Sequence, residues 1–388
     1  MKMMKRVMAR NEIIKILICI VSVLNLAIFI FSSDNFYNLG FFSLSARMLL
    51  IVNMLIFMCL VTKRIFECRV FYTLVLLILM IFAAYFSFLM HPYGSRMDFI
   101  ILLAGYLAVP IYILVIPEID TTDSLRNWFK GISLFYALFF IYCGFLRPTY
   151  RKGTNALMLG YSNSNRTGAY ILLTVVLMII LFSREEKRWI KVSIWMVEVS
   201  LMYLMILTQS RTAFLIALAC LLYSVISRAP QIGKKFSIFC ILFPAAFLIL
   251  YVFIYRQGWL LHTTILGRTI YSGRQYTFIA EAQSISAFGN YALGQFAGLN
   301  YVQAVLNTLG VMGIGLCWFY YIRFFSSEFL DNCDSGFSKN LSRFCFSVLM
   351  LHGCTETSFF TGGTVYAGMI GCILLAMSMN RSIENEEL

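Results

Sequence analysis

Charged residues are scarce in this sequence. Only 13% of its 388 residues are Asp, Glu, Lys or Arg, which is about half the charged fraction of a typical soluble domain. Hydrophobic residues make up 60% of the chain, and the mean hydropathy is +0.81. This balance excludes an ordinary soluble domain. It predicts an all-α, polytopic integral membrane protein.

The sequence also lacks a metal-binding cysteine pattern, an internal repeat and a low-complexity linker. The 11 cysteines include no pair with metal-ligand spacing, and most lie inside apolar runs, which predicts small apolar fillers. No metal or cofactor is expected. Without an internal repeat or a low-complexity linker, residues 1–388 are expected to form a single integral membrane domain. The net charge of +13 is attributed to basic cytoplasmic loops, so no nucleic-acid partner is expected.

Long apolar runs are what the sequence does contain. About 20 apolar residues in a helix cross a hydrocarbon core of about 30 Å. The first run is too long for the core of a signal peptide and has no obvious cleavage site, so it is interpreted as a span. About twelve transmembrane helices are predicted, approximately at 13–31, 41–61, 70–90, 99–117, 129–146, 167–183, 190–207, 212–227, 236–255, 302–322, 341–357 and 364–380.

The distribution of basic residues predicts the orientation. With the N-terminus inside, twenty-one of the 31 Lys and Arg residues fall in cytoplasmic segments, as the positive-inside rule requires. Both termini are then expected in the cytoplasm. A long extracytoplasmic loop is expected at about 256–301. The ten basic residues on the outer side make that face unusually cationic and suggest that it has a function.

Arg211 is the most informative single residue. It lies in Leu207-Thr208-Gln209-Ser210-Arg211-Thr212-Ala213, with apolar runs on both sides. An arginine within a span costs about 2.5–3.5 kcal/mol on insertion scales, so it normally faces a protein interior or wet cavity and marks function. The alternative is a structural arginine that extends to the interface from the outer end of a helix.

Two further segments complete a pattern with Arg211. The first, Tyr161 to Gly168, reads YSNSNRTG and opens the sixth predicted span. The second combines the outer-loop segment Ser272-Gly273-Arg274-Gln275-Tyr276 with a later helix that contains Gly310-Val311-Met312-Gly313. In this order the segments resemble those of the O-antigen ligase and Wzy-type polysaccharide polymerase superfamily. The resemblance covers roughly residues 160–325.

The resemblance implies an enzyme at the outer face of a bacterial inner membrane. It would transfer glycan from undecaprenyl pyrophosphate by a metal-independent, inverting reaction. The positions that match the family's pyrophosphate-binding arginines are Arg211 and Arg274, with Arg268 as a third candidate. A guanidinium suits this role because its forked donors match phosphate oxygens, and preset donors stabilise the charge that builds on the leaving group.

The sequence departs from the ligase pattern at one position. Ligases of the family have a His-Asn pair where this chain reads Leu299-Asn300. The base could then be His352 or Glu356, which are four residues apart and are expected on one helix face. A structural pairing of these two residues, and His262 as base, stay open. Asn165 is expected to cap or pack at a helix start, with glycan contact as the alternative.

The missing histidine favours a polymerase that joins lipid-linked repeat units for capsule, exopolysaccharide or O-antigen. The alternatives are an O-antigen ligase and, in a different class, a flippase for lipid-linked oligosaccharides. The expected partners are the undecaprenyl-pyrophosphate-linked glycan and membrane lipid, together with a flippase and a chain-length regulator as candidate protein partners.

Overall fold

The structure is a computed structural model of the chain. It describes residues 2–64, 68–90, 105, 108–109, 111–112, 123–226, 234–257, 264–265, 268–269, 287–289, 302, 305–306, 309–316, 318, 337–354 and 364–384.

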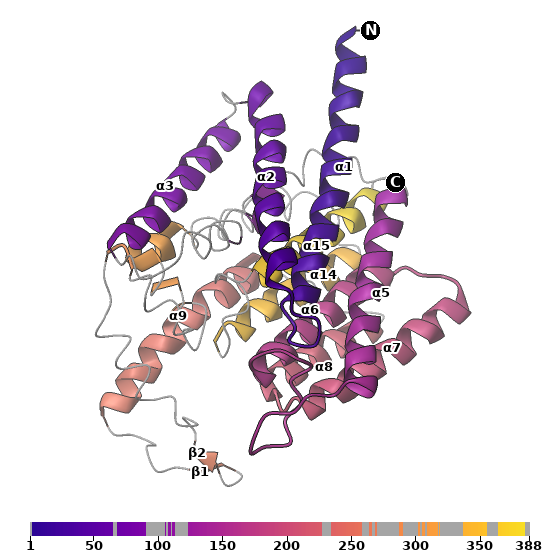
Figure 1. Cartoon of the computed structure of the whole chain (residues 1–388), viewed down its shortest axis with the longest axis vertical. Helices are drawn as coiled ribbons and strands as arrows, with labels where there is room; N and C mark the ends of the chain where they lie inside the picture. Colours follow the sequence, from indigo (N-terminus) through magenta and orange to yellow (C-terminus); the bar gives the residue numbers. More distant parts are fainter. Residues whose placement is uncertain are drawn as a thin grey trace.

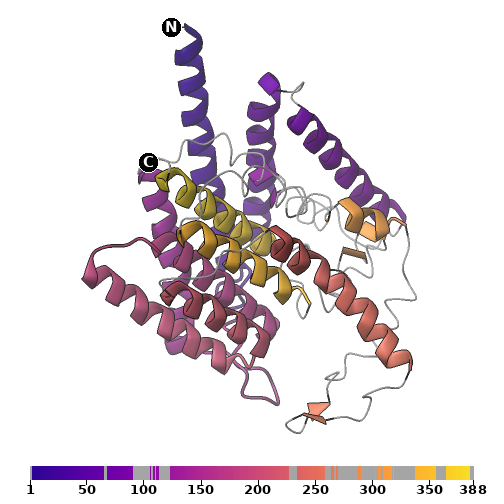
Figure 2. The same ribbon diagram turned by 180° about the vertical axis from the view of Figure 1, so that it is seen from behind.

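Helices dominate this part of the chain, which confirms the predicted all-α membrane class in its coarse form. The strands β1 (Thr264–Ile265) and β2 (Arg268–Thr269) form a small antiparallel pair, at the periphery beyond α9 in Figures 1 and 2. The helices are α1 (Lys2–Phe31), α2 (Leu39–Arg64), α3 (Cys68–Met90), α5 (Asp123–Leu146), α6 (Ser164–Phe182), α7 (Arg188–Leu207), α8 (Arg211–Val225), α9 (Lys234–Arg256), α14 (Phe337–His352) and α15 (Thr364–Glu384).

Each of these ten helices overlaps one of the predicted spans. The remaining two predicted spans, 99–117 and 302–322, are described only in part. Within the described ranges, α1, α2, α5, α6 and α7 contain segments long and apolar enough to cross a membrane. The count of twelve spans therefore stays a prediction.

Helix α6 forms the centre of the bundle. Its membrane-length segment is 83% buried, compared with 28% for α7, and it contacts α5, α7, α8, α14 and α15. A helix that is apolar on all sides is expected to be buried on all sides. The two ends of α6 therefore lie at opposite ends of the protein core, separated by about 28 Å for 19 residues at 1.5 Å each.

Helices α8 and α14 pack antiparallel beside α6. Cys345 lies beside Cys220, and the rings of Phe344 and Tyr223 stack with centroids 4.1 Å apart. Residue numbers therefore rise along α8 as they fall along α14. The start of α8 and the end of α14 consequently point toward the same end of the bundle.

Candidate functional site

The first turn of α6 is held by a polar cap. The side chain of Asn163 accepts a hydrogen bond from the backbone N–H of Asn165 at 2.9 Å. Asn163 is therefore the N-cap. Asn165, expected to cap or pack at a helix start, does not cap the helix but lies in its first turn. Arg166, on the same turn, donates from Nη1 to the Oγ of Ser162 at 3.3 Å.

The turn between α7 and α8 is tight and buried. Thr208 closes α7, and its Oγ1 accepts a hydrogen bond from the backbone N–H of Ser210 at 3.3 Å. Gln209 has a φ of 59°, in the left-handed region that non-glycine residues seldom occupy. Thr208 and Ser210 are buried, while Gln209 and Arg211 are exposed. The turn thus presents two polar side chains outward.

Gly168 brings these two segments together. A Cβ on this residue would lie 2.7 Å from the Oγ of Ser210 and 3.1 Å from the Oγ1 of Thr208. The first turn of α6 therefore touches the α7–α8 turn directly, which only glycine allows. From this contact, the Cα atoms of Arg166 and Arg211 lie within about 15 Å of each other by chain geometry.

The segment 147–163 covers the same end of the bundle. The N–H of Leu157 donates to the carbonyl of Leu207 at 2.9 Å. The Oγ of Ser33 donates to the carbonyl of Leu159 at 3.1 Å, and the hydroxyl of Tyr161 donates to the carbonyl of Phe29 at 3.3 Å. These bonds join the loop to α7 and to the end of α1. Segments 32–38, 147–166 and 207–211 are called the arginine end below.

The arginine end is strongly cationic. Asp34 is its one acidic residue, and Arg147 lies over the ring of Phe36 at 5.6 Å. Its five basic residues are Arg147, Arg151, Lys152, Arg166 and Arg211. Arg166 is half-buried and the other four are exposed. A surface of this composition attracts polyanions such as pyrophosphate.

Arg211 itself is the first residue of α8 and is exposed. Of the two expected surroundings, a protein interior or a wet cavity, the structure excludes the interior, because the break at 208–210 places Arg211 at an exposed helix end rather than within a span. The structure therefore agrees with the alternative of an arginine at the end of a helix. In that position the guanidinium is accessible to a ligand without the cost of burying a charge.

The helix face expected to be shared by His352 and Glu356 requires α14 to continue beyond His352. Helix α14 ends at His352, and Gly353 and Cys354 form a turn with hydrogen bonds to Met350 and Leu351. His352 is fully buried, whereas Glu356 lies outside the described residues. His352 has no exposed surface from which to contact an acceptor.

The other predicted arginines lie in the long loop. Arg268 pairs with Ile265 across the β1–β2 strand pair, so the structure gives its backbone position. Arg274 and His262 lie outside the described residues. Of the third segment, residues 272–276 lie outside the described residues, while residues 310–313 are described and contact residues 287–289, where the N–H of Met312 donates to the carbonyl of Ala287 at 3.2 Å. The structure therefore joins the Gly168 and Arg211 segments.

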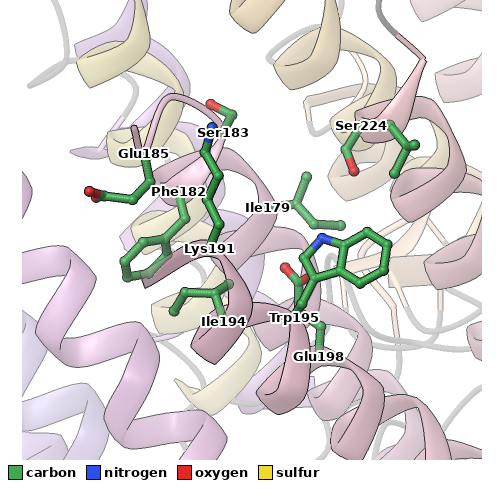
Figure 3. A pocket seen from close by; sticks show the side chains of 10 residues that line it. Ile179, Phe182, Ser183, Glu185, Lys191, Ile194, Trp195, Glu198 and Ser224 are labelled. Atoms are coloured by element: carbon green, nitrogen blue, oxygen red, sulfur yellow. The ribbon is translucent and has the colours of Figure 1, made fainter. Parts of the chain in front are cut away.

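The structure also contains a pocket, at the opposite end of α6, that was not predicted from the sequence. It has a volume of about 270 Å³ and is lined by the last turn of α6, the first half of α7 and the end of α8 (Figure 3). Glu198 is only 7% exposed and lines this pocket. The sequence signal was present, because Glu198 is a lone carboxylate inside an apolar run.

Within the described ranges, no three His, Cys, Asp or Glu residues gather as metal ligands would. No protein-family model matches the sequence, and no curated protein matches it.

Proposed function

We propose that the protein is a polysaccharide polymerase of a bacterial inner membrane, with both termini in the cytoplasm and about twelve transmembrane helices. It joins undecaprenyl-pyrophosphate-linked repeat units at the outer face, where the arginine end lies. The observation that carries the proposal is the contact of Gly168 with the Thr208–Ser210 turn. That contact supports it because two of the three family-like segments meet beside accessible cationic side chains.

In the proposed reaction, an acceptor sugar hydroxyl attacks C1 of the donor glycan with inversion. The bond between C1 and the pyrophosphate oxygen breaks, and undecaprenyl pyrophosphate leaves with the bonding electrons. Arg211 binds that leaving group, with Arg274 and Arg268 from the outer loop as further donors. Fixed donors at the developing charge lower the barrier.

The hydroxyl proton passes to a general base. A base must lie within hydrogen-bond reach of the proton it removes, and His352 is fully buried. We therefore favour Glu356 as the base to test first, with His352 as the second. Glu356→Gln should abolish chain extension under this proposal, while His352→Gln should act on stability.

The test compares Arg211→Ala with Arg188→Ala in a strain that lacks the chromosomal gene. Both arginines are exposed and each is the first residue of its helix, α8 and α7 respectively, but Arg188 lies at the opposite end of the bundle. We expect Arg211→Ala to produce single repeat units, at normal protein level, and Arg188→Ala to produce full-length chains on a size-resolving gel. Equal chain lengths would contradict the assigned role of Arg211.

The same gel on the deletion strain separates the alternatives. Single repeat units establish a polymerase, whereas full-length chains stranded on the carrier lipid indicate an O-antigen ligase. Loss of all outer-face glycan, with lipid-linked units trapped inside, indicates a flippase and overturns the arginine mechanism. If a chain-length regulator is a partner of this protein, its removal should alter the length of the polymer without abolishing polymer.

A further inference from the structure

The pocket at the far end of α6 contains a charge that the proposed polymerase reaction does not use. Glu198 is the eleventh residue of α7, about 15 Å from its start at 1.5 Å per residue. It is 7% exposed, and the described part of the chain offers it no hydrogen bond or ion pair. A buried carboxylate without a partner is costly, so a group that enters the pocket is expected to compensate it.

The surroundings of Glu198 suit an ammonium group. Trp195 lies one helical turn before Glu198, on the same face of α7, and both line the pocket (Figure 3). Cations bind over the faces of indole rings. From α8, the Oγ of Ser224 donates to the carbonyl of Leu221 at 2.7 Å, which leaves its lone pairs free to accept a hydrogen bond from a ligand N–H.

A divalent metal fits less well. Calcium and magnesium take six or more oxygen ligands, mostly carboxylates, carbonyls and waters. Around Glu198 the lining is mainly apolar, with Ile179, Ile194 and Val225 contributing surface. Of the two carboxylates that line the pocket, Glu185 is paired with Lys130. Glu198 is left in an apolar and aromatic setting, which matches a single organic cation instead.

Lys191 supplies a charge of the opposite sign. It lines the same pocket two turns nearer the start of α7, about 10.5 Å before Glu198 along the helix axis. The two side chains are separate, since no ion pair joins them in the structure. The second carboxylate of the lining, Glu185, is already paired with Lys130, with Nζ and Oε2 2.8 Å apart. The pocket is thus negative at its Glu198 side and positive near its Lys191 side, which complements a ligand carrying both charges.

We propose that this pocket binds a zwitterionic aminophosphate, with the ammonium at Glu198 and the phosphate at Lys191. The headgroup of phosphatidylethanolamine and free phosphoethanolamine share this chemistry. An exposed Trp195 and a basic segment at 184–191 are typical of a membrane interface, so the lipid headgroup is the source we expect.

Full-length protein in nanodiscs of phosphatidylglycerol gives the test. Phosphatidylethanolamine is added in one arm and free phosphoethanolamine in the other. Binding is followed by native mass spectrometry and by tryptophan fluorescence. Glu198→Gln should weaken binding roughly 10- to 100-fold, as expected for a lost charge-assisted bond. Glu186→Gln is the matched control, because Glu186 is exposed nearby and does not line the pocket.

Lys191→Gln sharpens the assignment of the two ends of the ligand. It should weaken phosphoethanolamine binding but leave ethanolamine, which has no phosphate, unchanged. If Glu198→Gln weakens binding of phosphatidylethanolamine alone, the pocket is a lipid site. If it weakens binding of free phosphoethanolamine, the pocket binds a soluble ligand. If wild type binds neither probe, the proposal is wrong. It is also wrong if Glu198→Gln and Glu186→Gln bind the probes equally well and both unfold cooperatively on heating, which shows that both are folded.

Discussion

The two ends of α6 handle charge in opposite ways. At the arginine end, four of five basic side chains are exposed, and backbone hydrogen bonds hold the loops that carry them. At the pocket, the carboxyl of Glu198 is buried among apolar side chains. Exposed charges cost the fold little and remain available to a large anionic ligand. A buried charge costs the fold free energy until a small partner neutralises it.

This contrast separates function from stability at each end. Substitution of Arg211 at the arginine end should change activity and leave the free energy of unfolding almost unchanged. Substitution of Glu198 should change the free energy of unfolding and the response to ligand. The following predictions test that division, beginning with the largest expected effect.

Arg211→Ala should lower chain extension by about 10²–10³-fold, the usual cost of one preorganised donor to a developing negative charge. Because Arg211 is exposed, the thermal midpoint should stay within a degree or two of wild type, as for other exposed sites. Polymer yield and thermal unfolding of the purified protein measure the two quantities. A large drop in the thermal midpoint would contradict the expectation that Arg211 contributes to activity and not to stability.

Gly168→Ala should separate α6 from the α7–α8 turn. The new methyl group would meet Ser210 and Thr208, and overpacking of this kind costs about 1–3 kcal/mol. We expect lower stability together with reduced polymer. Gly131→Ala is the matched control, because no atom lies within 4 Å of a Cβ on Gly131 in α5; it should be neutral or slightly stabilising.

Glu198→Gln should raise the stability of the ligand-free protein above neutral pH, where the buried carboxyl carries a charge without a partner and the amide carries none; the expected gain is about 1–3 kcal/mol. Added phosphoethanolamine or phosphatidylethanolamine should stabilise wild type and not the variant. Thermal unfolding in detergent with and without each probe gives both values. A variant less stable than wild type would show that Glu198 already has a partner.

The smallest effect is expected at the ion pair of Lys130 and Glu185, whose Nζ and Oε2 are 2.8 Å apart. The hydrogen bond from Lys130 lowers the pKa of Glu185 below its ordinary value. A lowered carboxyl pKa stabilises the fold at neutral pH, and the contribution is lost as pH falls from about 4.3 through the lower folded-state value. Glu185→Gln should therefore cost about 0–1 kcal/mol at pH 7.

The pH dependence provides the check on that last prediction. Wild type and Glu185→Gln should differ in thermal midpoint at pH 7 and converge as the solution is acidified. A difference that persists unchanged at low pH would assign the effect to packing rather than to charge.

Hydropathy located the helices well because it depends on a local sum over about 20 residues. The predicted break at 208–211 shows what hydropathy does not reveal, namely the surroundings of a single side chain. The sequence located the interruption, but only the structure placed Arg211 at the start of α8 and in the open. Similarly, two asparagines and a serine near 163–165 made a helix start predictable, whereas the choice of Asn163 as cap depended on where the backbone enters the helix.

His352 shows a second limit. A spacing of four residues places two side chains on one face only if the helix continues, and α14 ends at His352. Glu198 shows a third limit, because a lone carboxylate in an apolar run signals a site without indicating its kind. Its assignment to a pocket required knowing that α6 and α8 pack beside α7.

By itself the sequence determined the helical membrane class, the approximate ends of the described helices and the scarcity of charge within them. These properties follow from local composition and from the cost of polar groups in hydrocarbon. Only the tertiary structure decided that Gly168 meets the Thr208–Ser210 turn and that Glu198 faces a pocket. Both contacts join separate helices whose relative positions depend on side-chain packing across the whole bundle, which no local window of sequence contains.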